Sequence, residues 1–257
     1  MERNRNTGWA NYSKHFSSDD AAAAYNDLYT AETADSRVWT RQQRALADVL
    51  VRIPRGDNSA LDYACGTGRI SNLLTEVDWS VIGVDSSQAM LRLAQERVPD
   101  ARFVDGNMLE PSAIDDEWLG PHMLTTAIRL FLNVDEIHRA KLLEGLRLRT
   151  NAVGTVIVNN HGSSPSLRAL SLRMRGDQDS NVLASRQFER MLELSGLEVG
   201  RVLSSGLWTR QVYRMSRVGR FAIWIEDQLD SNSFGKWVLR RFGSDQLYVC
   251  TIRQPHA

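Results

Sequence analysis

From residue 59 onward, short apolar runs alternate with segments of helical periodicity, and this alternation constrains the fold more than any other feature. Apolar runs occupy 59–64, 81–85, 101–105, 123–128 and 155–160, and helical segments at 69–77, 86–98 and 136–149 lie between them. Strands that alternate with helices form right-handed crossovers and a mostly parallel sheet with helices on both faces. A further helix at 185–196 precedes apolar runs at 197–203 and 246–252. We therefore expect an α/β fold with seven strands.

Two segments lie outside this alternation, and we expect both to be helical. The first belongs to residues 1–54, where helical periodicity from 9 to 50 is followed by Pro54 and Gly56. The second, 204–245, separates the last two strands and is too long for a hairpin loop. Its many large aromatic rings favour an ordered, helical insertion. The expected organisation is a helical N-terminal cap at 1–54 and one α/β domain at 55–257 that contains the insertion.

The segment from Leu61 to Ile70, LDYACGTGRI, predicts a buried strand, a glycine turn and the start of a helix. Gly66 and Gly68 allow a ligand to approach the backbone closely, because a Cβ atom would block it. The first turn of the helix would offer free N–H groups to the same ligand. A dinucleotide-binding loop needs a third glycine three residues later, where this chain has Ser71. The acidic Asp62 ends the strand and is expected to point toward the ligand cleft.

The glycine turn resembles the first motif of the class I S-adenosylmethionine-dependent methyltransferases, in which an acidic residue precedes three glycines at alternate positions. The matching positions here are Asp62, Ala64, Gly66 and Gly68, with Cys65 inside the turn. Ala64 replaces the first glycine, which is a mild departure because alanine is the next smallest residue. The resemblance implies that this turn contacts S-adenosylmethionine.

Two further acidic residues follow in the order that this family shows. The resemblance places Asp85, with Ser86, at the ribose hydroxyls, and a carboxylate can accept hydrogen bonds from two adjacent hydroxyls. The match to the adenine-edge contact is the run of Asp105, Gly106, Asn107 and Met108. Asp105 would accept a hydrogen bond from the exocyclic amine, and Met108 would pack on the ring.

The spacing of these motifs supports the resemblance. Asp85 follows Gly68 by 17 residues and Asp105 follows Asp85 by 20, so both acids are expected at the ends of successive strands. An isolated aspartate at such a position is more often a helix cap or turn residue. Three motifs in order across residues 59–160 favour ligand binding instead. The resemblance also implies a last strand antiparallel to the rest of the sheet.

The methyl acceptor is expected near the ends of the fourth and fifth strands, because open α/β sheets bind ligands outside the carboxyl ends of their strands. Arg129 would hold an anionic group of the acceptor or contact the cofactor, and Asn133 and Asn160 would orient the acceptor. His161 is the candidate base, because an ordinary pKa of about 6.5 suits proton transfer at neutral pH. The alternatives are a hydrogen-bonded loop histidine and an arginine paired with the acidic start of the helix at 136–149.

The two helical segments are expected to cover this site. Tyr25 and Tyr29 would lie near the methyl group and Trp208 near the acceptor, with core packing as the alternative. From Trp208 to Phe242, seven basic residues stand against three acidic ones. A basic aromatic stretch of this kind lies on a membrane surface, faces an anionic substrate, or is an ordinary solvated helix.

Composition excludes several other classes of protein. Lysine plus arginine equals aspartate plus glutamate at 31 each, whereas proteins that bind nucleic acid usually carry a basic excess. The N-terminus lacks an apolar signal, and no run of about 18 apolar residues occurs. Cys65 and Cys250 form neither a disulfide framework nor a zinc motif. We therefore expect a cytoplasmic protein with no metal and no nucleic-acid partner.

Together these features predict methyl transfer from S-adenosylmethionine to a small molecule. Transfer to oxygen of a natural product, a sugar or a lipid-linked saccharide is preferred, and N-methylation of a small molecule is the nearest alternative. A nicotinamide-dependent oxidoreductase is disfavoured by Ser71 and by the position of Asp62. A catalytically silent cofactor-binding subunit is the remaining alternative, and only a turnover assay separates it from an enzyme. The oligomeric state is not predicted.

Overall fold

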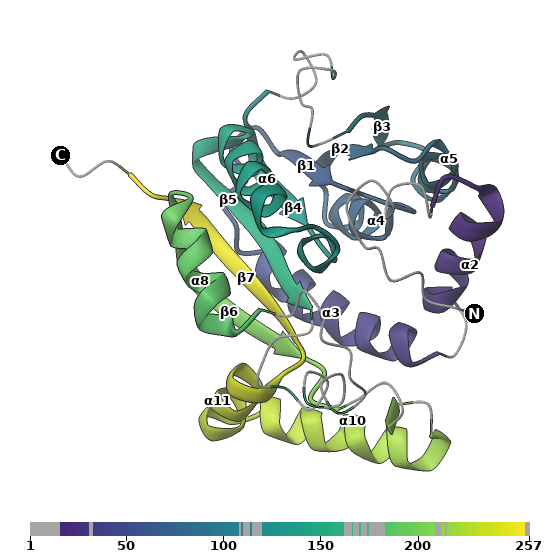
Figure 1. Ribbon diagram of the computed structural model, residues 1–257, viewed down its shortest axis with the longest axis vertical. Helices are drawn as coiled ribbons and strands as arrows, with labels where there is room; N and C mark the ends of the chain where they lie inside the picture. The colour runs from purple at the N-terminus through teal and green to yellow at the C-terminus, as the bar shows by residue number, and fades with distance from the viewer. Residues whose placement is uncertain are drawn as a thin grey trace.

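A single seven-stranded sheet forms the centre of the molecule (Figure 1). The computed structural model describes residues 16–30, 33–107, 109, 114, 120–161, 166, 170, 174, 183–208, 212–213 and 215–254, with backbone alone for His161 and a few other positions. The strands are β1 (Ser59–Tyr63), β2 (Ser80–Asp85), β3 (Arg102–Asp105), β4 (His122–Ala127), β5 (Thr150–His161), β6 (Leu197–Ser205) and β7 (Asp245–Ile252). Their order across the sheet is β3-β2-β1-β4-β5-β7-β6.

The sheet is parallel except at its last strand. The five strands from β3 to β5 pair in parallel. Strand β7 lies between β5 and β6 and is antiparallel to both. The prediction of a seven-stranded, mostly parallel sheet with an antiparallel last strand is therefore confirmed.

Helices cover both faces of the sheet. They are α2 (Asp19–Thr30), α3 (Ala34–Leu50), α4 (Arg69–Glu76), α5 (Gln88–Arg97), α6 (Glu136–Leu148), α8 (Ser185–Leu194), α10 (Ser216–Asp230) and α11 (Ser233–Phe242), with a short 3₁₀ turn η3 (Phe131–Asn133). Helices α6 and α8 pack on one face, and α3 and α4 on the other. Within the described residues, no helix is long and apolar enough to cross a membrane.

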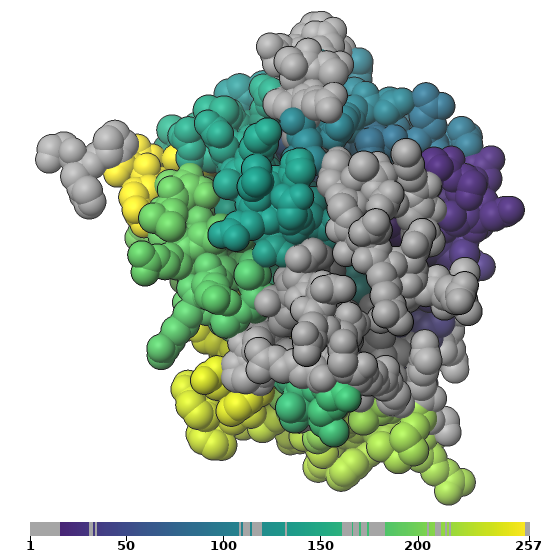
Figure 2. All heavy atoms as spheres, in the orientation of Figure 1, coloured from purple at the N-terminus to yellow at the C-terminus, as the bar shows by residue number. Residues whose placement is uncertain are grey.

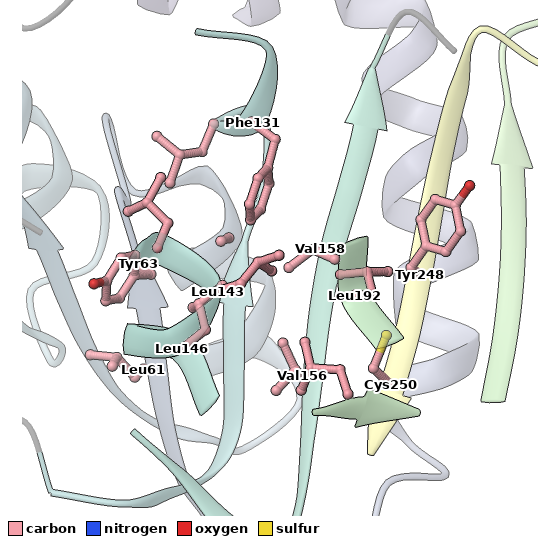
Figure 3. Close-up of a cluster of buried hydrophobic side chains, with 14 of the residues drawn as sticks. Leu61, Tyr63, Phe131, Leu143, Leu146, Val156, Val158, Leu192, Tyr248 and Cys250 are labelled. Atoms are coloured by element: carbon pink, nitrogen blue, oxygen red, sulfur yellow. The ribbon is translucent and has the colours of Figure 1, made fainter. Parts of the chain in front are cut away.

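The period of two along β1 divides its side chains between two cores. Leu61 and Tyr63 point into the core beneath α6 and α8, together with Leu143 and Val158 (Figure 3). Ala60 points the other way, into the core shared with α3 and α4. Burial on both faces is typical of a parallel sheet enclosed by crossover helices.

In the described parts of the two segments outside the alternation, the structure has the helices α2 and α3 and the helices α10 and α11, as predicted. In the N-terminal segment, the Thr33 hydroxyl accepts a hydrogen bond from the Ser36 N–H at 3.0 Å and caps α3. Leu46 and Leu50 of α3 are buried in the core that this helix shares with α4, so α3 helps to cover the sheet. In the insertion, α10 and α11 follow β6, and Asn232 caps α11 by accepting from the Gly235 N–H at 2.8 Å.

Candidate functional site

The order of the strands reverses between β1 and β4, and such a reversal opens a crevice beyond the carboxyl ends of the two strands. The turn at 64–68 follows β1, and the loop at 128–130 follows β4. The glycine turn and Arg129 therefore flank the same crevice. This is the position at which open α/β sheets bind their ligands.

The glycine turn has a left-handed backbone at three positions. The φ angle is +59° at Ala64, +55° at Gly66 and +71° at Gly68. The Cys65 N–H donates to the Val84 carbonyl at 3.0 Å, which ties the turn to β2. A Cβ atom built on Gly66 would meet no atom of the described residues within 4 Å. This side of the turn is thus open to a ligand that approaches the backbone closely.

Two carboxylates lie beside the turn. The Asp85 side chain ends β2 and accepts hydrogen bonds from the N–H groups of Gly66 and Ser87, both at 2.9 Å. Burial raises the pKa of this carboxyl. Asp105 ends β3 in register with Asp85 and accepts a hydrogen bond from Gln88 Nε2 at 2.9 Å. Each carboxylate oxygen has two acceptor sites, so both groups can still accept hydrogen bonds from a ligand.

The residues that follow these acids form the rest of this edge. Ser86 is exposed next to Asp85. The Gly106 N–H donates to the Asp85 carbonyl at 3.0 Å, and the Asn107 side chain accepts a backbone N–H at 3.1 Å in the turn after β3. The structure thus brings these predicted ligand contacts together. Met108 lies outside the described residues.

Asp62 lies beneath the glycine turn, where only 1% of its surface is exposed. Its Oδ2 accepts from the Ser71 hydroxyl at 2.7 Å, and its Oδ1 accepts from the Thr126 hydroxyl at 2.8 Å. Burial raises its pKa to about 6. The carboxylate therefore joins α4 to β4 and positions the turn. This corrects the expectation that Asp62 points into the cleft, because two hydroxyls that the sequence does not place near it orient it inward.

Cys65 serves the same local packing. Its thiol lies 3.0 Å from the position that a Cβ on Gly83 would occupy, and burial raises its pKa well above the ordinary value. A neutral, buried thiol of this kind is a small packing group and a poor nucleophile.

Helix α2 places two tyrosines against the first residue of α4. Arg69 directly follows the glycine turn, and its Nη2 donates to the Tyr25 hydroxyl at 3.1 Å. Its guanidinium carbon lies 3.4 Å from the centre of the Tyr29 ring and 4.8 Å from that of Trp39. Its Nη1 is buried and has no hydrogen-bond partner among the described residues. A buried donor without a partner is a candidate contact for an acceptor group on a ligand.

Arg129 lies in the loop after β4 and has a left-handed φ of +64°. Its backbone N–H donates to the side-chain oxygen of Asn159, which holds the residue in this conformation. The guanidinium lies 3.5 Å from Asp35 Oδ1 and 5.5 Å from the centre of the Tyr29 ring. The sequence suggested a pair with the acidic start of α6. The partner is instead Asp35 of α3, and Asp135 caps α6 by accepting from the His138 N–H.

The two arginines set the charge of this part of the site. Burial raises the pKa of Tyr25, but the positive charges of Arg69 and Arg129 outweigh it and leave that pKa below its ordinary value. For Tyr29 burial prevails, and its pKa is raised. Burial lowers the pKa of Arg129, whereas the neighbouring tyrosines and carboxylates raise it by more. The arginine is therefore charged at any physiological pH.

The remaining predicted residues contact the chain itself. The Asn133 side chain donates to the Arg129 carbonyl at 2.7 Å and fixes the loop after β4. The Asn160 side chain donates to the Leu183 carbonyl at 3.1 Å, and its oxygen is buried without a partner among the described residues. Trp208 donates from Nε1 to the Ala222 carbonyl at 3.2 Å, which anchors α10. His161 ends β5, and its side chain is not among those described.

Sequence reasoning did not identify Arg69, Arg97 or Asp35. Arg97 ends α5 and donates to the Thr67 hydroxyl of the glycine turn at 3.1 Å and to the Asn26 side chain of α2. It therefore links the turn to the N-terminal helix. For Arg69, the position directly after Gly68 was an available signal. For the other two residues, the sequence holds none.

Comparison with known proteins relates the chain to methyltransferases. Residues 60–147 match the family model described as methyltransferase domain. A trans-aconitate 2-methyltransferase of Afipia carboxidovorans is 41% identical over 69 residues, which are 25% of this chain and 27% of that protein. An uncharacterised methyltransferase of Alkaliphilus oremlandii is 24% identical over 167 residues, 64% of this chain and 75% of that protein. The chain thus spans about a quarter of the length of the trans-aconitate methyltransferases that it matches.

Solved structures show the same fold. Magnesium protoporphyrin IX methyltransferase of Synechocystis, crystallised with SAH, superposes with a TM-score of 0.64 at 12% identity, over 96% of this chain and 99% of that one. A TehB-like SAM-dependent methyltransferase of Corynebacterium glutamicum gives 0.55 at 18% identity, over 95% and 100%. The family match over residues 60–147 and the fold agree, and together they support a class I S-adenosylmethionine-dependent methyltransferase domain.

Proposed function

We propose that this chain, as a class I methyltransferase, transfers the methyl group of S-adenosylmethionine to an oxygen of a small-molecule acceptor. The observation that carries the proposal is the edge at the strand reversal, where the open side of Gly66 adjoins the carboxylates of Asp85 and Asp105. A nucleoside fits such an edge, because the carboxylates accept hydrogen bonds from hydroxyl and amino groups while the turn admits close contact.

The cofactor supplies an electrophilic methyl group on a sulfonium, and the transfer is an in-line displacement. The residues of the chain therefore contribute mainly orientation and proximity. Asp85 would bind the ribose hydroxyls and Asp105 the adenine amine. Asp62 holds the turn in place through α4 and β4. Helix α2 lies over the turn through Arg69 and Tyr25, where it would limit the access of water to the methyl group.

We propose further that the acceptor carries an anionic group held by Arg129. This arginine is nearly buried, with 11% of its side chain exposed, and its Nη2 lies 3.5 Å from the Asp35 carboxylate. Arg69 contributes a second guanidinium whose Nη1 has no partner among the described residues. The relatives named for trans-aconitate agree with an acidic acceptor, although the matched part is about a quarter of each protein. Natural products, sugars and lipid-linked saccharides with acidic groups are the classes to screen.

His161 remains the proposed base that takes the proton of the acceptor hydroxyl. It ends β5 in register with Asp245, next to the crevice. Replacing His161 by Ala should lower the maximal rate at saturating acceptor and leave cofactor affinity unchanged. His138→Ala, on α6, is the matched control and should retain the wild-type rate. An undiminished rate for His161→Ala would remove the histidine from the mechanism, and methylation of an amine would move the reaction from oxygen to nitrogen.

Calorimetric titration tests the cofactor directly. S-adenosylmethionine should bind and NADH should not. Asp85→Asn should weaken binding at least about tenfold, because it removes the charge and replaces one accepting oxygen by an NH2 donor, and a hydrogen bond to a charged group contributes about 1.5–3 kcal/mol. Asp100→Asn, an exposed position before β3, makes the same chemical change away from the site and should bind normally. Tight binding of NADH would contradict the proposal, and cofactor binding without turnover on any acceptor would favour the silent subunit.

A further inference from the structure

Helices α10 and α11 expose large aromatic rings in stacked pairs. Phe221 and Trp224 of α10 are 59% and 55% exposed, and their ring centres are 5.6 Å apart at an interplanar angle of 17°. Phe234 and Trp237 of α11 are 71% and 57% exposed, with ring centres 5.9 Å apart at 22°. We call these four residues the aromatic face. Both helices lie along the lower edge of the molecule in Figure 2.

The aromatic face is the side of each helix turned away from the protein. On α10, the residues that pack inward are Gly219, Ala222 and Glu226. Phe221 and Trp224 lie on the opposite side of the helix, because each residue advances by about 100°. Large apolar side chains that gather on an exposed surface mark a site of interaction with another apolar phase.

The charge around the rings is positive. The exposed basic residues of the two helices are Arg217, Arg220, Lys236, Arg240 and Arg241, of which Arg240 is paired with Glu189 of α8 at 3.6 Å. The three acidic residues of α10 offset this charge only in part. Glu226 is fully buried and accepts from the Tyr213 hydroxyl. Asp227 is paired with Arg41 of α3, and Asp230 is the remaining exposed acid on α10.

We propose that the aromatic face and its basic residues bind the surface of a bilayer that contains anionic phospholipids. Indole and phenyl rings partition to the boundary between headgroups and acyl chains, and arginine and lysine pair with the lipid phosphates. A second copy of this chain fits less well, because a symmetric contact through this face would bring two basic surfaces together. Charge complementarity therefore selects the lipid surface over self-association.

The position of these helices connects this surface with the crevice. Helix α10 is reached from the end of β6, and α11 leads into the start of β7. Ser205 and His161 both pair with Asp245, so the helices join the sheet at the edge where β5 ends. This is the carboxyl edge on which the crevice opens. A bilayer bound to α10 and α11 would therefore lie at the end of the molecule that receives the acceptor.

Cosedimentation with vesicles tests the proposal without any assay of activity. The full chain should sediment with phosphatidylcholine vesicles that contain about 30% phosphatidylglycerol at low salt, and binding should decrease as salt screens the charges. Pure phosphatidylcholine vesicles should bind it weakly. Bromolipids should quench the fluorescence of bound protein, and the Trp224→Phe, Trp237→Phe double variant should lose most of that quenching while it still binds.

Charge reversal with a matched control decides which surface is used. Arg217→Glu with Arg220→Glu should weaken binding about thirtyfold or more, since each basic side chain near an anionic surface contributes about a fivefold factor. Arg52→Glu with Arg253→Glu changes the net charge equally at exposed positions on the opposite edge of the sheet. This control should bind nearly as the wild type does. All four positions are exposed, so melting temperatures should stay close to the wild-type value.

Three results would overturn the proposal. The first is no sedimentation with anionic vesicles at low salt. The second is equal weakening by the two double variants, because net charge would then explain the binding without a specific face. The third is a dimer in analytical ultracentrifugation that Trp224→Ala with Trp237→Ala dissociates, since the aromatic face would then be covered by a second copy.

Discussion

Replacing Gly66 by Ala separates the stability of the glycine turn from its capacity to bind a ligand. At a φ of +55°, an L-residue in the left-handed region costs about 1–2 kcal/mol. The added Cβ would meet no described atom within 4 Å, so no steric cost is added. We expect the free energy of unfolding to decrease by about 1–2 kcal/mol. The turn should keep its shape, because Ala64 already carries a Cβ at a φ of +59° two residues earlier.

Gly68→Ala provides the contrast. Its φ of +71° imposes the same backbone cost, but its Cβ would lie 3.0 Å from both Cα and Cβ of Ala94 in α5. Backbone atoms cannot yield as the end of a long side chain does, so α4 and α5 must shift apart. Overpacking of this kind costs about 1–3 kcal/mol. The total expected decrease is therefore about 2–5 kcal/mol.

Gly66→Ala, the variant with the smaller expected loss of stability, should nevertheless bind the ligand clearly more weakly than the wild type. In Gly66→Ala the new methyl group enters the open space from which the cofactor would approach the backbone, so S-adenosylhomocysteine should bind at least about tenfold more weakly, equivalent to about 1.4 kcal/mol. This loss should occur in a protein that is still folded at 25 °C. The loss of stability would thus come from the left-handed backbone, and the loss of affinity from the new methyl group in the space that the cofactor would occupy.

Two measurements check this reasoning. Urea denaturation followed by circular dichroism gives the free energy of unfolding without ligand, and calorimetry gives the affinity for S-adenosylhomocysteine. Gly200→Ala in β6 is the control, since its Cβ would have its nearest contact at an ordinary 3.6 Å, and we expect wild-type affinity and a change in stability below about 1 kcal/mol. Wild-type affinity in Gly66→Ala would refute the assignment of this turn to the cofactor.

Two further predictions concern buried acids. Burial raises the pKa of Asp62 from 3.8 to about 6, so the folded state holds its proton more tightly than the unfolded state does. The stability contributed by this group is therefore present below about pH 4, and up to about 3 kcal/mol of it is lost as pH rises through about 6. Urea titrations at pH 4 and pH 7 should show that Asp62→Asn abolishes this loss. Arg41→Met should lower the free energy of unfolding by about 3 kcal/mol, because Arg41 Nε lies 3.3 Å from the buried Glu226 carboxylate. Adding Glu226→Gln to the same chain should restore part of the lost stability. Denaturation curves that show no recovery would contradict this account.

The strands were predictable where apolar runs are continuous, and less so elsewhere. Strand β5 starts at Thr150, five residues before the apolar run, because Thr150 pairs with His122 ahead of a register shift whose extra residues lie in β5. The intervening residues up to Gly154 include no continuous apolar run. Residues 151–154 form the irregularity between the Thr150–His122 and Thr155–Leu124 pairs, which local sequence does not reveal.

The candidate site also has parts that the sequence predicts and parts that it does not. The glycine turn, Asp85 and Asp105 were predictable, because each directly follows a strand and the carboxyl ends of parallel strands share an edge. The partner of Arg129 was not, since Asp35 lies 94 residues earlier on a helix whose docking no local pattern specifies. The inward orientation of Asp62 depends equally on Thr126, a distant neighbour in the sheet.

Helix α10 shows most clearly why composition alone was insufficient. Its aromatic content predicted an ordered helix, but not that this helix buries Glu226 and exposes Trp224. A buried carboxylate is tolerated only when partners compensate it. Here the Tyr213 hydroxyl and the Leu207 N–H donate to Glu226 Oε1, and the charged Arg41 of α3 lies 3.3 Å from Oε2. With the inward side of the helix committed to that carboxylate, the indole lies outward, in water. Local preference and the observed arrangement therefore disagree at this helix, and such disagreement is expected where a surface serves an interaction. A bilayer would supply the apolar phase that the protein core does not.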